Sequence, residues 1–259
     1  MIKVFSFVGS CAEKNSSTLK YSDSLAEVFT KKAAEIGEEV IYKKAVGSQL
    51  DIKFCKSCAS CFMKGVCPLD SLDDMAQLKK DFLDSDIIFF GTPVYIWEMS
   101  GITKCVIDRI AYWSHTFELT GKIGVVYAVT DTSKAIEVSK NLTDLLRHMG
   151  LIVVKSAYAF NCAKPNLHLE AEIQPEYEEI SSLLLEAVKN PTKFITPLQE
   201  ASFISSKNSY LRSQKVYETL ELPLDEYDVN ISLARGIGDY ASFKDFKIDV
   251  MKRGFRNDI

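Results

Sequence analysis

The 259-residue sequence has no long apolar run, no excess of basic charge and only three histidines. Its longest apolar runs, within 86–91 and 151–154, are too short to cross a bilayer, so no membrane role is predicted. Residues 1–9 lack the charged start, long apolar core and small-residue cleavage site of a signal peptide. The net charge of −4, with acids and bases interspersed, argues against nucleic-acid binding. We therefore expect a cytoplasmic protein with no nucleic-acid or membrane partner.

The cysteines, by contrast, are clustered. Four of the seven lie within thirteen residues, at Cys55, Cys58, Cys61 and Cys67. The spacing, C-x2-C-x2-C-x5-C followed by Pro68, is related to the bacterial ferredoxin run C-x2-C-x2-C-x3-C-P, whose thiolates bind an iron–sulfur cluster. Clustered thiols in a reducing compartment indicate metal or redox chemistry, and the odd cysteine count disfavours a disulfide framework. This segment alone predicts an electron carrier, with a structural zinc site as the alternative.

Apolar strand patterns alternate with amphipathic helical patterns through the first three quarters of the chain. Strands are predicted at 2–8, 39–46, 86–90, 122–130 and 151–160, and helices at 17–36, 72–83, 101–113, 133–149 and 175–188. This alternation implies an α/β fold with a parallel sheet covered by helices on both faces. Because crossovers are right-handed, five strands fit the flavodoxin-like order 2-1-3-4-5.

In that strand order, ligands bind at the carboxyl ends of the strands. Three loops, 9–18, 91–101 and 130–133, are expected to meet there. The Cys-rich loop, 54–68, interrupts the connection to the helix before the third strand. It can therefore lie at the same edge of the sheet.

The pattern changes in the last quarter, where Phe203, Tyr210 and Tyr217 recur at a helical spacing. We predict a mainly helical C-terminal extension, 195–259, attached to a flavodoxin-like domain, 1–194. The apolar side chains of the extension would pack on their own domain or cover a neighbouring subunit. We expect a homodimer or homotetramer.

The loop after the first predicted strand is rich in small and hydroxyl residues, with Gly9-Ser10 followed by Ser16-Ser17-Thr18. Hydroxyls and free N–H groups at a helix N-terminus form a phosphate cradle, although the same residues also make an ordinary helix cap. The chain has neither the Gly-Lys-Ser/Thr of a Walker A loop nor a G-x-G-x-x-G run, so those nucleotide sites are not predicted. No histidine has a second ligand at zinc-site spacing, and no catalytic histidine is predicted.

Aromatic residues mark the loop after the third predicted strand, where Tyr95 and Trp97 follow a buried run. Exposed aromatics there are costly unless a flat group stacks on them or a partner covers them. A flavin ring satisfies this requirement. Packing in a hydrophobic corner is the alternative.

These motifs, together with Gly91-Thr92-Pro93-Val94-Tyr95 and Ser100-Gly101…Lys104…Asp108-Arg109, resemble the NADPH-dependent FMN reductase superfamily and, within it, the iron–sulfur flavoprotein branch. The resemblance implies FMN with its phosphate at Ser10, Ser16, Ser17 and Thr18. It implies a flavin ring over Pro93, Val94, Tyr95 and Trp97, closed by Thr130 and Asp131. It also implies a [4Fe–4S] cluster on Cys55, Cys58, Cys61 and Cys67, close to FMN.

One departure concerns the phosphate loop, because Cys11-Ala12 stands where relatives have Pro-Arg and a phosphate-neutralising charge is absent. Lys14 could supply that charge. The resemblance implies an oxidoreductase that passes electrons between ferredoxin or NAD(P)H and an acceptor. Two alternatives stay open: an NAD(P)H-dependent FMN reductase of quinone, nitro or azo compounds without a cluster, and a zinc-stabilised interaction module.

Overall fold

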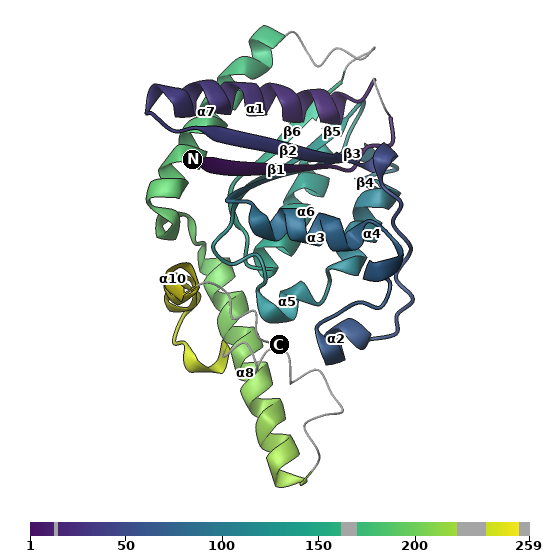
Figure 1. Cartoon of the computed structure of the whole chain (residues 1–259), viewed down its shortest axis with the longest axis vertical. Coiled ribbons are helices and arrows are strands. Elements are labelled where there is room, and N and C mark those ends of the chain that lie inside the picture. The colour runs from purple at the N-terminus through teal and green to yellow at the C-terminus, as the bar shows by residue number, and fades with distance from the viewer. Residues whose placement is uncertain (13–14, 162–169, 222–236, 254–259) are drawn as a thin grey trace.

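A parallel β-sheet forms the centre of the computed structural model, which describes residues 1–12, 15–161, 170–221 and 237–253 (Figure 1). Its strands are β1 (Ile2–Val8), β2 (Val40–Val46), β3 (Ile87–Tyr95), β5 (Ile123–Thr130) and β6 (Ile152–Phe160). They lie in the order β2-β1-β3-β5-β6, and the short β4 (Glu98–Met99) pairs antiparallel with the end of β3. Without β4 this is the order 2-1-3-4-5, so the predicted flavodoxin-like α/β fold is confirmed.

Helices cover both faces of this sheet, as Figure 1 shows. On one face α1 (Ser17–Glu35) and α7 (Glu170–Lys189) enclose a core that includes Tyr21 and Tyr127. On the other face α3 (Met75–Asp84), α4 (Gly101–Arg109), α5 (Trp113–Thr116) and α6 (Ala135–His148) pack on the remaining core. The central strands are apolar on both sides because both of their faces are covered, which explains the unbroken hydrophobic runs in the sequence.

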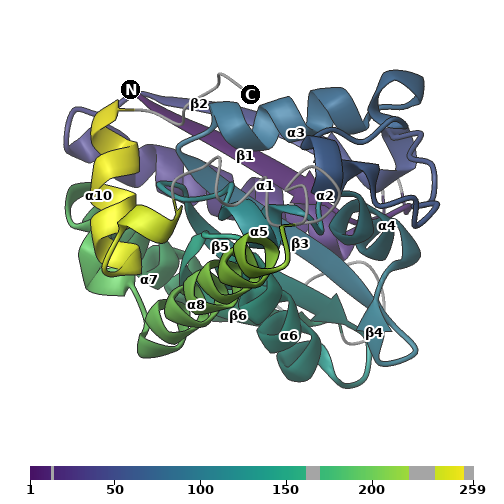
Figure 2. The ribbon, with the colours of Figure 1, turned by 90° about the horizontal axis from the view of Figure 1, so that it is seen from below.

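The described part of the C-terminal extension is helical, with α8 (Pro197–Thr219) and α10 (Phe243–Arg253). Phe203 on α8 packs with Phe243 and Phe246 on α10 and with Phe117 of the sheet domain. Figure 2 shows α10 beside α8 on the same side of the molecule. This contact fixes the first half of α8 to its own domain. No helix in the described ranges is both long enough and apolar enough to cross a membrane.

Short elements complete the fold: α2 (Ser60–Lys64) and the 3-10 turns η1 (Gly47–Gln49), η2 (Asp70–Leu72), η3 (Pro191–Phe194) and η5 (Ile237–Asp239). The segment between η1 and η2 contains the Cys-rich loop, 54–68, and α2. At η1 this segment is attached to the end of β1, because the Ser48 N–H donates to the Ser10 carbonyl oxygen at 3.1 Å. The chain that leads into the Cys-rich loop therefore leaves the sheet at the edge where the strands end.

Gly91, within β3, lies against the buried Tyr127 ring. A Cβ atom at position 91 would lie 2.1 Å from Cζ of Tyr127, and that ring is stacked on Tyr21 at 4.4 Å. We expect Gly91→Ala to lower the free energy of unfolding by about 1–3 kcal/mol in urea denaturation, because the ring has no room to withdraw. Gly101→Ala is the control, since its Cβ would meet nothing within 4 Å. Equal stability of the two variants would contradict this expectation.

Candidate functional site

A cavity of about 170 Å³ lies at the carboxyl ends of β1, β3 and β5. Its wall contains nine of the ten residues predicted to bind FMN: Ser10, Ser16, Ser17, Thr18, Pro93, Val94, Tyr95, Thr130 and Asp131. The tenth, Trp97, is not part of the wall. Lys14, suggested as a phosphate-neutralising residue, lies outside the described residues. The fold therefore brings together side chains from three loops that are far apart in the sequence.

The N-terminus of α1 forms one side of the cavity. Ser16 caps the helix by accepting a hydrogen bond from the Leu19 N–H at 3.0 Å, and Ser10 Oγ accepts from the Ala12 N–H at 3.2 Å. The Ser17 hydroxyl oxygen is buried and has no hydrogen-bond partner among the described residues. The first turn of α1 contains no acidic residue. Free helix N–H groups, a positive helix end and an unpartnered hydroxyl suit an anion such as phosphate.

Hydrogen bonds join the phosphate-type loop to the loop after β3. The Gly9 N–H donates to the Gly91 carbonyl oxygen at 2.8 Å, and the Ser100 hydroxyl donates to the Gly9 carbonyl oxygen. Ser100 also caps α4, and its hydroxyl lies 2.8 Å from that of Thr103. Position 9 needs glycine because a Cβ there would lie 1.8 Å from Oγ1 of Thr103. The two loops therefore form one rigid wall.

Asn161 directly follows β6 and completes the opposite wall, and the sequence analysis missed it. Its amide nitrogen donates to Oδ1 of Asp131 at 3.0 Å, while its amide oxygen is buried without a partner among the described residues. The position of Asn161 in the sequence could have predicted this role, because a polar residue directly after the last strand of such a sheet lies at the same carboxyl edge. Asn161 and Asp131 can together bind polar groups of a ligand.

A strained two-residue turn joins β3 to β4. Ile96 and Trp97 both have positive φ angles, of 48° and 68°, which a β-branched residue such as isoleucine rarely adopts. Tyr95, Ile96 and Trp97 are 53%, 93% and 68% exposed. Burial raises the pKa of the Tyr95 hydroxyl, and the nearby Cys11 and Asp131 raise it further. The turn presents apolar surface beside the cavity, and strain of this kind is common at functional sites.

The four clustered cysteines differ in their surroundings. Cys55 and Cys58 are exposed, Cys61 is half-buried and Cys67 is buried. Burial raises the pKa of Cys61, and the nearby thiols of Cys67 and Cys55 raise it further. The Cys58 sulfur instead lies 3.6 Å from the Ser60 hydroxyl. Within the ranges that the structure describes, no three potential ligands are placed to share a metal ion.

The donor set of this loop is that of an iron–sulfur or thiolate-metal site, with four thiols and no histidine between positions 54 and 68. The backbone on either side of Cys58 is left-handed, because Ser57 and Ala59 have positive φ angles of 53° and 56°. The chemistry of the four donors fits a cluster.

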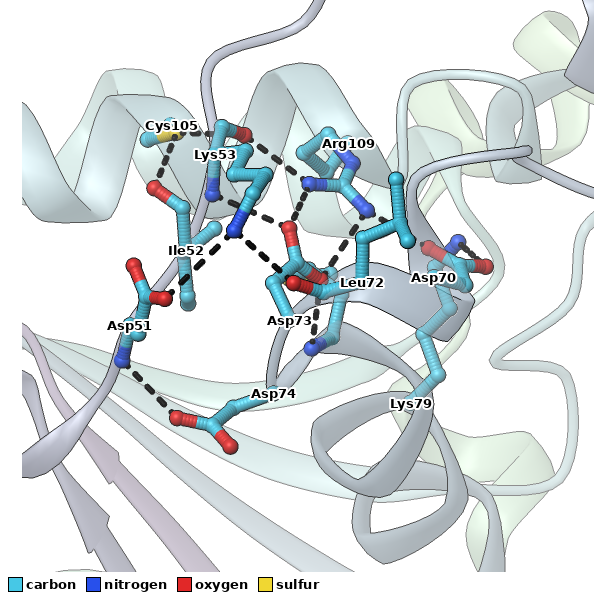
Figure 3. A network of polar contacts seen from close by, with 11 residues as sticks. Asp51, Ile52, Lys53, Asp70, Leu72, Asp73, Asp74, Lys79, Cys105 and Arg109 are labelled. Carbon is cyan, nitrogen blue, oxygen red and sulfur yellow. Dashed lines mark hydrogen bonds and ion pairs between the residues drawn. The ribbon is translucent and has the colours of Figure 1, made fainter.

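A buried ion-pair network holds the base of the loop (Figure 3). The Arg109 guanidinium, at the end of α4, pairs with Asp70 and Asp73. Asp73 also accepts from the Lys53 N–H at 2.9 Å, and Lys79 pairs with Asp70 at 2.6 Å. The neighbouring Asp108 pairs with Lys104 on the surface of the same helix, at 2.5 Å. The network therefore links the two flanks of the Cys-rich loop to α3 and α4.

Two relatives with known sequences are similar to part of the chain. An iron–sulfur flavoprotein of Archaeoglobus fulgidus is 34% identical over 116 residues, which are 44% of this chain and 51% of that protein. An iron–sulfur flavoprotein of Methanocaldococcus jannaschii is 29% identical over 128 residues, 49% of this chain and 62% of that protein. The chain thus spans about half to six-tenths of the length of these relatives.

Solved structures share the fold at low identity. An NADH:FMN oxidoreductase in its apo form superposes with a TM-score of 0.53 at 16% identity, over 72% of this chain and 90% of that one. A flavone reductase superposes with a TM-score of 0.53 at 17% identity, over 74% of this chain and 65% of that chain. The family model described as NADPH-dependent FMN reductase matches residues 2–165, which include β1 to β6 and all three loops of the cavity. Since this match extends over well more than half of the sequence, the chain belongs to the NADPH-dependent FMN reductase family.

Proposed function

We propose that the protein is an FMN-dependent oxidoreductase with a [4Fe–4S] cluster, passing electrons between ferredoxin or NAD(P)H and an acceptor. The observation that carries the proposal is the cavity at the strand ends, where Ser17 and Asn161 each bury a polar atom without a partner among the described residues. The segment that leads into the Cys-rich loop leaves the sheet at the same edge. Bound FMN supplies both two-electron and one-electron chemistry, whereas a cluster passes single electrons.

The chain's own residues would bind and orient the flavin. Ser10, Ser16, Ser17 and Thr18 would hold the phosphate at the α1 N-terminus. A volume of about 170 Å³ is below that of typical ligand pockets, so the cavity suits the phosphate and ribityl chain. The ring would then lie over Pro93, Val94 and Tyr95, with the exposed Trp97 at its margin. Thr130, Asp131 and Asn161 would offer polar contacts from the opposite side.

The experiment that tests this function is anaerobic purification followed by analysis of FMN, iron, acid-labile sulfide and zinc. We expect bound FMN together with about four iron and four sulfide per chain. FMN without iron would remove the cluster from the proposal and leave the flavin site. A colourless protein with stoichiometric zinc would instead support the interaction module.

A second candidate is an NAD(P)H-dependent FMN reductase of quinone, nitro or azo compounds without a cluster. The favouring observation is that, in the described part of the chain, the four thiols are not gathered. Steady-state reduction of such acceptors by NAD(P)H that is unaffected by Cys58→Ala would support this candidate. Loss of electron transfer from ferredoxin in the same variant would contradict it.

Charge on the Cys-rich loop supports an acidic protein as electron donor. Between 52 and 69 the sequence has Lys53, Lys56 and Lys64 and no acidic residue, although the whole chain carries −4. Lys56 and Lys64 are exposed, as is Phe54 at 80%. Ferredoxins that carry carboxylates around their cluster would complement this basic surface with an apolar centre.

We expect Lys56→Glu combined with Lys64→Glu to slow electron transfer from a reduced acidic bacterial ferredoxin about tenfold or more at low ionic strength, because steering is lost. Stopped-flow absorbance measures the second-order rate constant. Lys140→Glu, an exposed charge reversal on α6, is the matched control. The difference in rate constant between the double variant and wild type should become smaller as the salt concentration is raised. Equal rates for the double variant and the control would argue against docking at this loop.

The division into a domain 1–194 and an extension 195–259, and a homodimer or homotetramer, are proposals as well. The second half of α8 exposes Leu211 and Val216, at 40% and 48%, and the residue that caps its C-terminus, Leu220, is 60% exposed. A neighbouring subunit would cover this surface. Sedimentation analysis of the FMN-loaded protein tests the assembly, and a monomer at micromolar concentration would contradict it.

A further inference from the structure

A second cavity, of about 260 Å³, lies where the second half of α6 meets the start of α8. Figure 2 shows these two helices beside each other, and residues of both line the cavity. It shares no residue with the cavity at the strand ends. α6 begins at Ala135, just after Thr130 and Asp131 of that first cavity, and ends at His148 in the second. The two cavities therefore lie toward opposite ends of one helix.

Gln199, in the first turn of α8, lines the second cavity and is only 2% exposed. Its amide nitrogen donates to the carbonyl oxygens of Leu151 at 3.1 Å and Arg147 at 3.4 Å. These two bonds fix the amide, because turning it over would place its oxygen against two other oxygens. In this orientation Oε1 is buried and accepts no hydrogen bond from any described residue. Gln199 thus keeps an acceptor without a donor.

Arg147, which also lines the cavity, has the complementary deficit. Its Nη2 donates to the Val153 carbonyl oxygen at 3.1 Å, and its Nη1 lies 3.9 Å from Oδ1 of Asp144. Its Nε is buried and has no acceptor in the described part of the chain. Native proteins leave few buried polar atoms unpaired, so each one calls for an explanation. Arg147 and Gln199 are neighbours, and together they offer one unused donor and one unused acceptor.

The charges around this cavity balance. Arg147 and Asp144 carry opposite charges, and both line it. Burial lowers the pKa of His148, so this imidazole is uncharged at neutral pH. The remaining lining residues are uncharged, and Leu145 and Leu198 add apolar surface. A cavity without net charge favours a neutral ligand with an apolar body over an ion.

We propose that this cavity binds a small neutral amide, whose carbonyl oxygen accepts from Nε–H of Arg147 and whose N–H donates to Oε1 of Gln199. An amide is a neutral group that places an acceptor and a donor side by side. A volume of about 260 Å³ is slightly below that of sites for drug-sized molecules, so an apolar body of about one ring fits. Because both helices contribute, the ligand would hold α8, and with it the C-terminal extension, against the sheet domain. The inference does not depend on FMN or on a cluster.

Benzamide is the probe that tests this site on the full-length wild-type protein. In TROSY spectra of nitrogen-15-labelled protein we expect benzamide to shift signals of 141–148 and 198–202, including the Gln199 side-chain amide. A dissociation constant of about 1 mM is expected for a ligand of about nine non-hydrogen atoms. Shifts confined to the loops 9–18, 91–101 and 130–133, or none with about 10 mM benzamide, would overturn the proposal.

Two matched probes test the hydrogen bonds without any substitution in the protein. Acetophenone keeps the ring and the carbonyl but has no N–H, and benzoate replaces the amide with a charged carboxylate. Both should bind about tenfold more weakly than benzamide, because each leaves the Gln199 acceptor without a donor. Equal affinities of the three probes would overturn the amide assignment.

Variants place the probe on the named residues. Arg147→Lys keeps the charge but removes Nε, and should weaken benzamide binding about tenfold. Leu198→Ala removes apolar wall from a residue that is 59% exposed, and should weaken binding about threefold. Ile204→Ala, an exposed apolar residue of α8 outside the cavity, is the control and should match wild type. Wild-type affinity in Arg147→Lys and Leu198→Ala would overturn the site.

Discussion

Cys58→Ala is expected to remove the iron and acid-labile sulfide from the anaerobically purified protein while leaving its FMN content unchanged. A [4Fe–4S] cluster takes one thiolate on each iron, so loss of one ligand opens the cluster to solvent. Cys58 is exposed, and its sulfur contacts the Ser60 hydroxyl rather than the core. Alanine at this position therefore costs about 0.5 kcal/mol of stability or less. The expected loss of iron is close to complete, which makes this the largest effect of any substitution in the loop.

Cys11→Ala is the matched control, because Cys11 is also an exposed cysteine and lies in the loop after β1. Its iron and sulfide contents should equal those of wild type. Colorimetric iron and sulfide analysis, with flavin absorbance for FMN, measures all three quantities in one preparation. Full iron and sulfide contents in Cys58→Ala would contradict the assignment of Cys58 as a ligand of the cluster.

The sheet was predictable because each buried strand has a strong local pattern, but strand ends depend on neighbours. The unbroken apolar run predicts that the third strand ends at Phe90, and it is followed by Gly91 and Pro93, residue types that usually interrupt strands. In the structure β3 continues to Tyr95, because Gly91 to Pro93 pair with Tyr127 to Val129 of β5. Packing against an adjacent strand outweighed the local preference. The last helix of the sheet domain also begins earlier than predicted, because α7 starts at Glu170 and contains Pro175.

The cavity was predictable for a different reason, because the strand order alone brings three loops to one edge. Trp97 lies away from the wall since it occupies the strained turn between β3 and β4, and that antiparallel turn was not expected. The Arg109–Asp73 pair joins residues 36 positions apart, and no local pattern encodes such a contact. Pairings set by tertiary packing are the part of the site that sequence reasoning does not reach.

Ser17→Asp is expected to weaken FMN binding by at least about 100-fold, the second of the two largest effects. Ser17 is the first residue of α1, and its hydroxyl lines the cavity without a hydrogen-bond partner in the described part of the chain. A carboxylate there would repel a bound phosphate and remove a hydrogen-bond donor. Two like charges about 4 Å apart interact by about 1 kcal/mol in water and about 4 kcal/mol near a protein surface, so a loss of this size follows.

The same substitution should stabilise the apoprotein, which separates a binding defect from a folding defect. The first turn of α1 has no acidic residue, so an aspartate there would interact favourably with the helix dipole, by about 0.3–1 kcal/mol. Fluorescence titration of apoprotein with FMN and urea unfolding measure the two effects. Leu198→Asp, in the exposed first turn of α8, is the control that should leave FMN affinity unchanged. Wild-type FMN affinity in Ser17→Asp would place the phosphate elsewhere, because an anion site cannot tolerate a carboxylate at its centre.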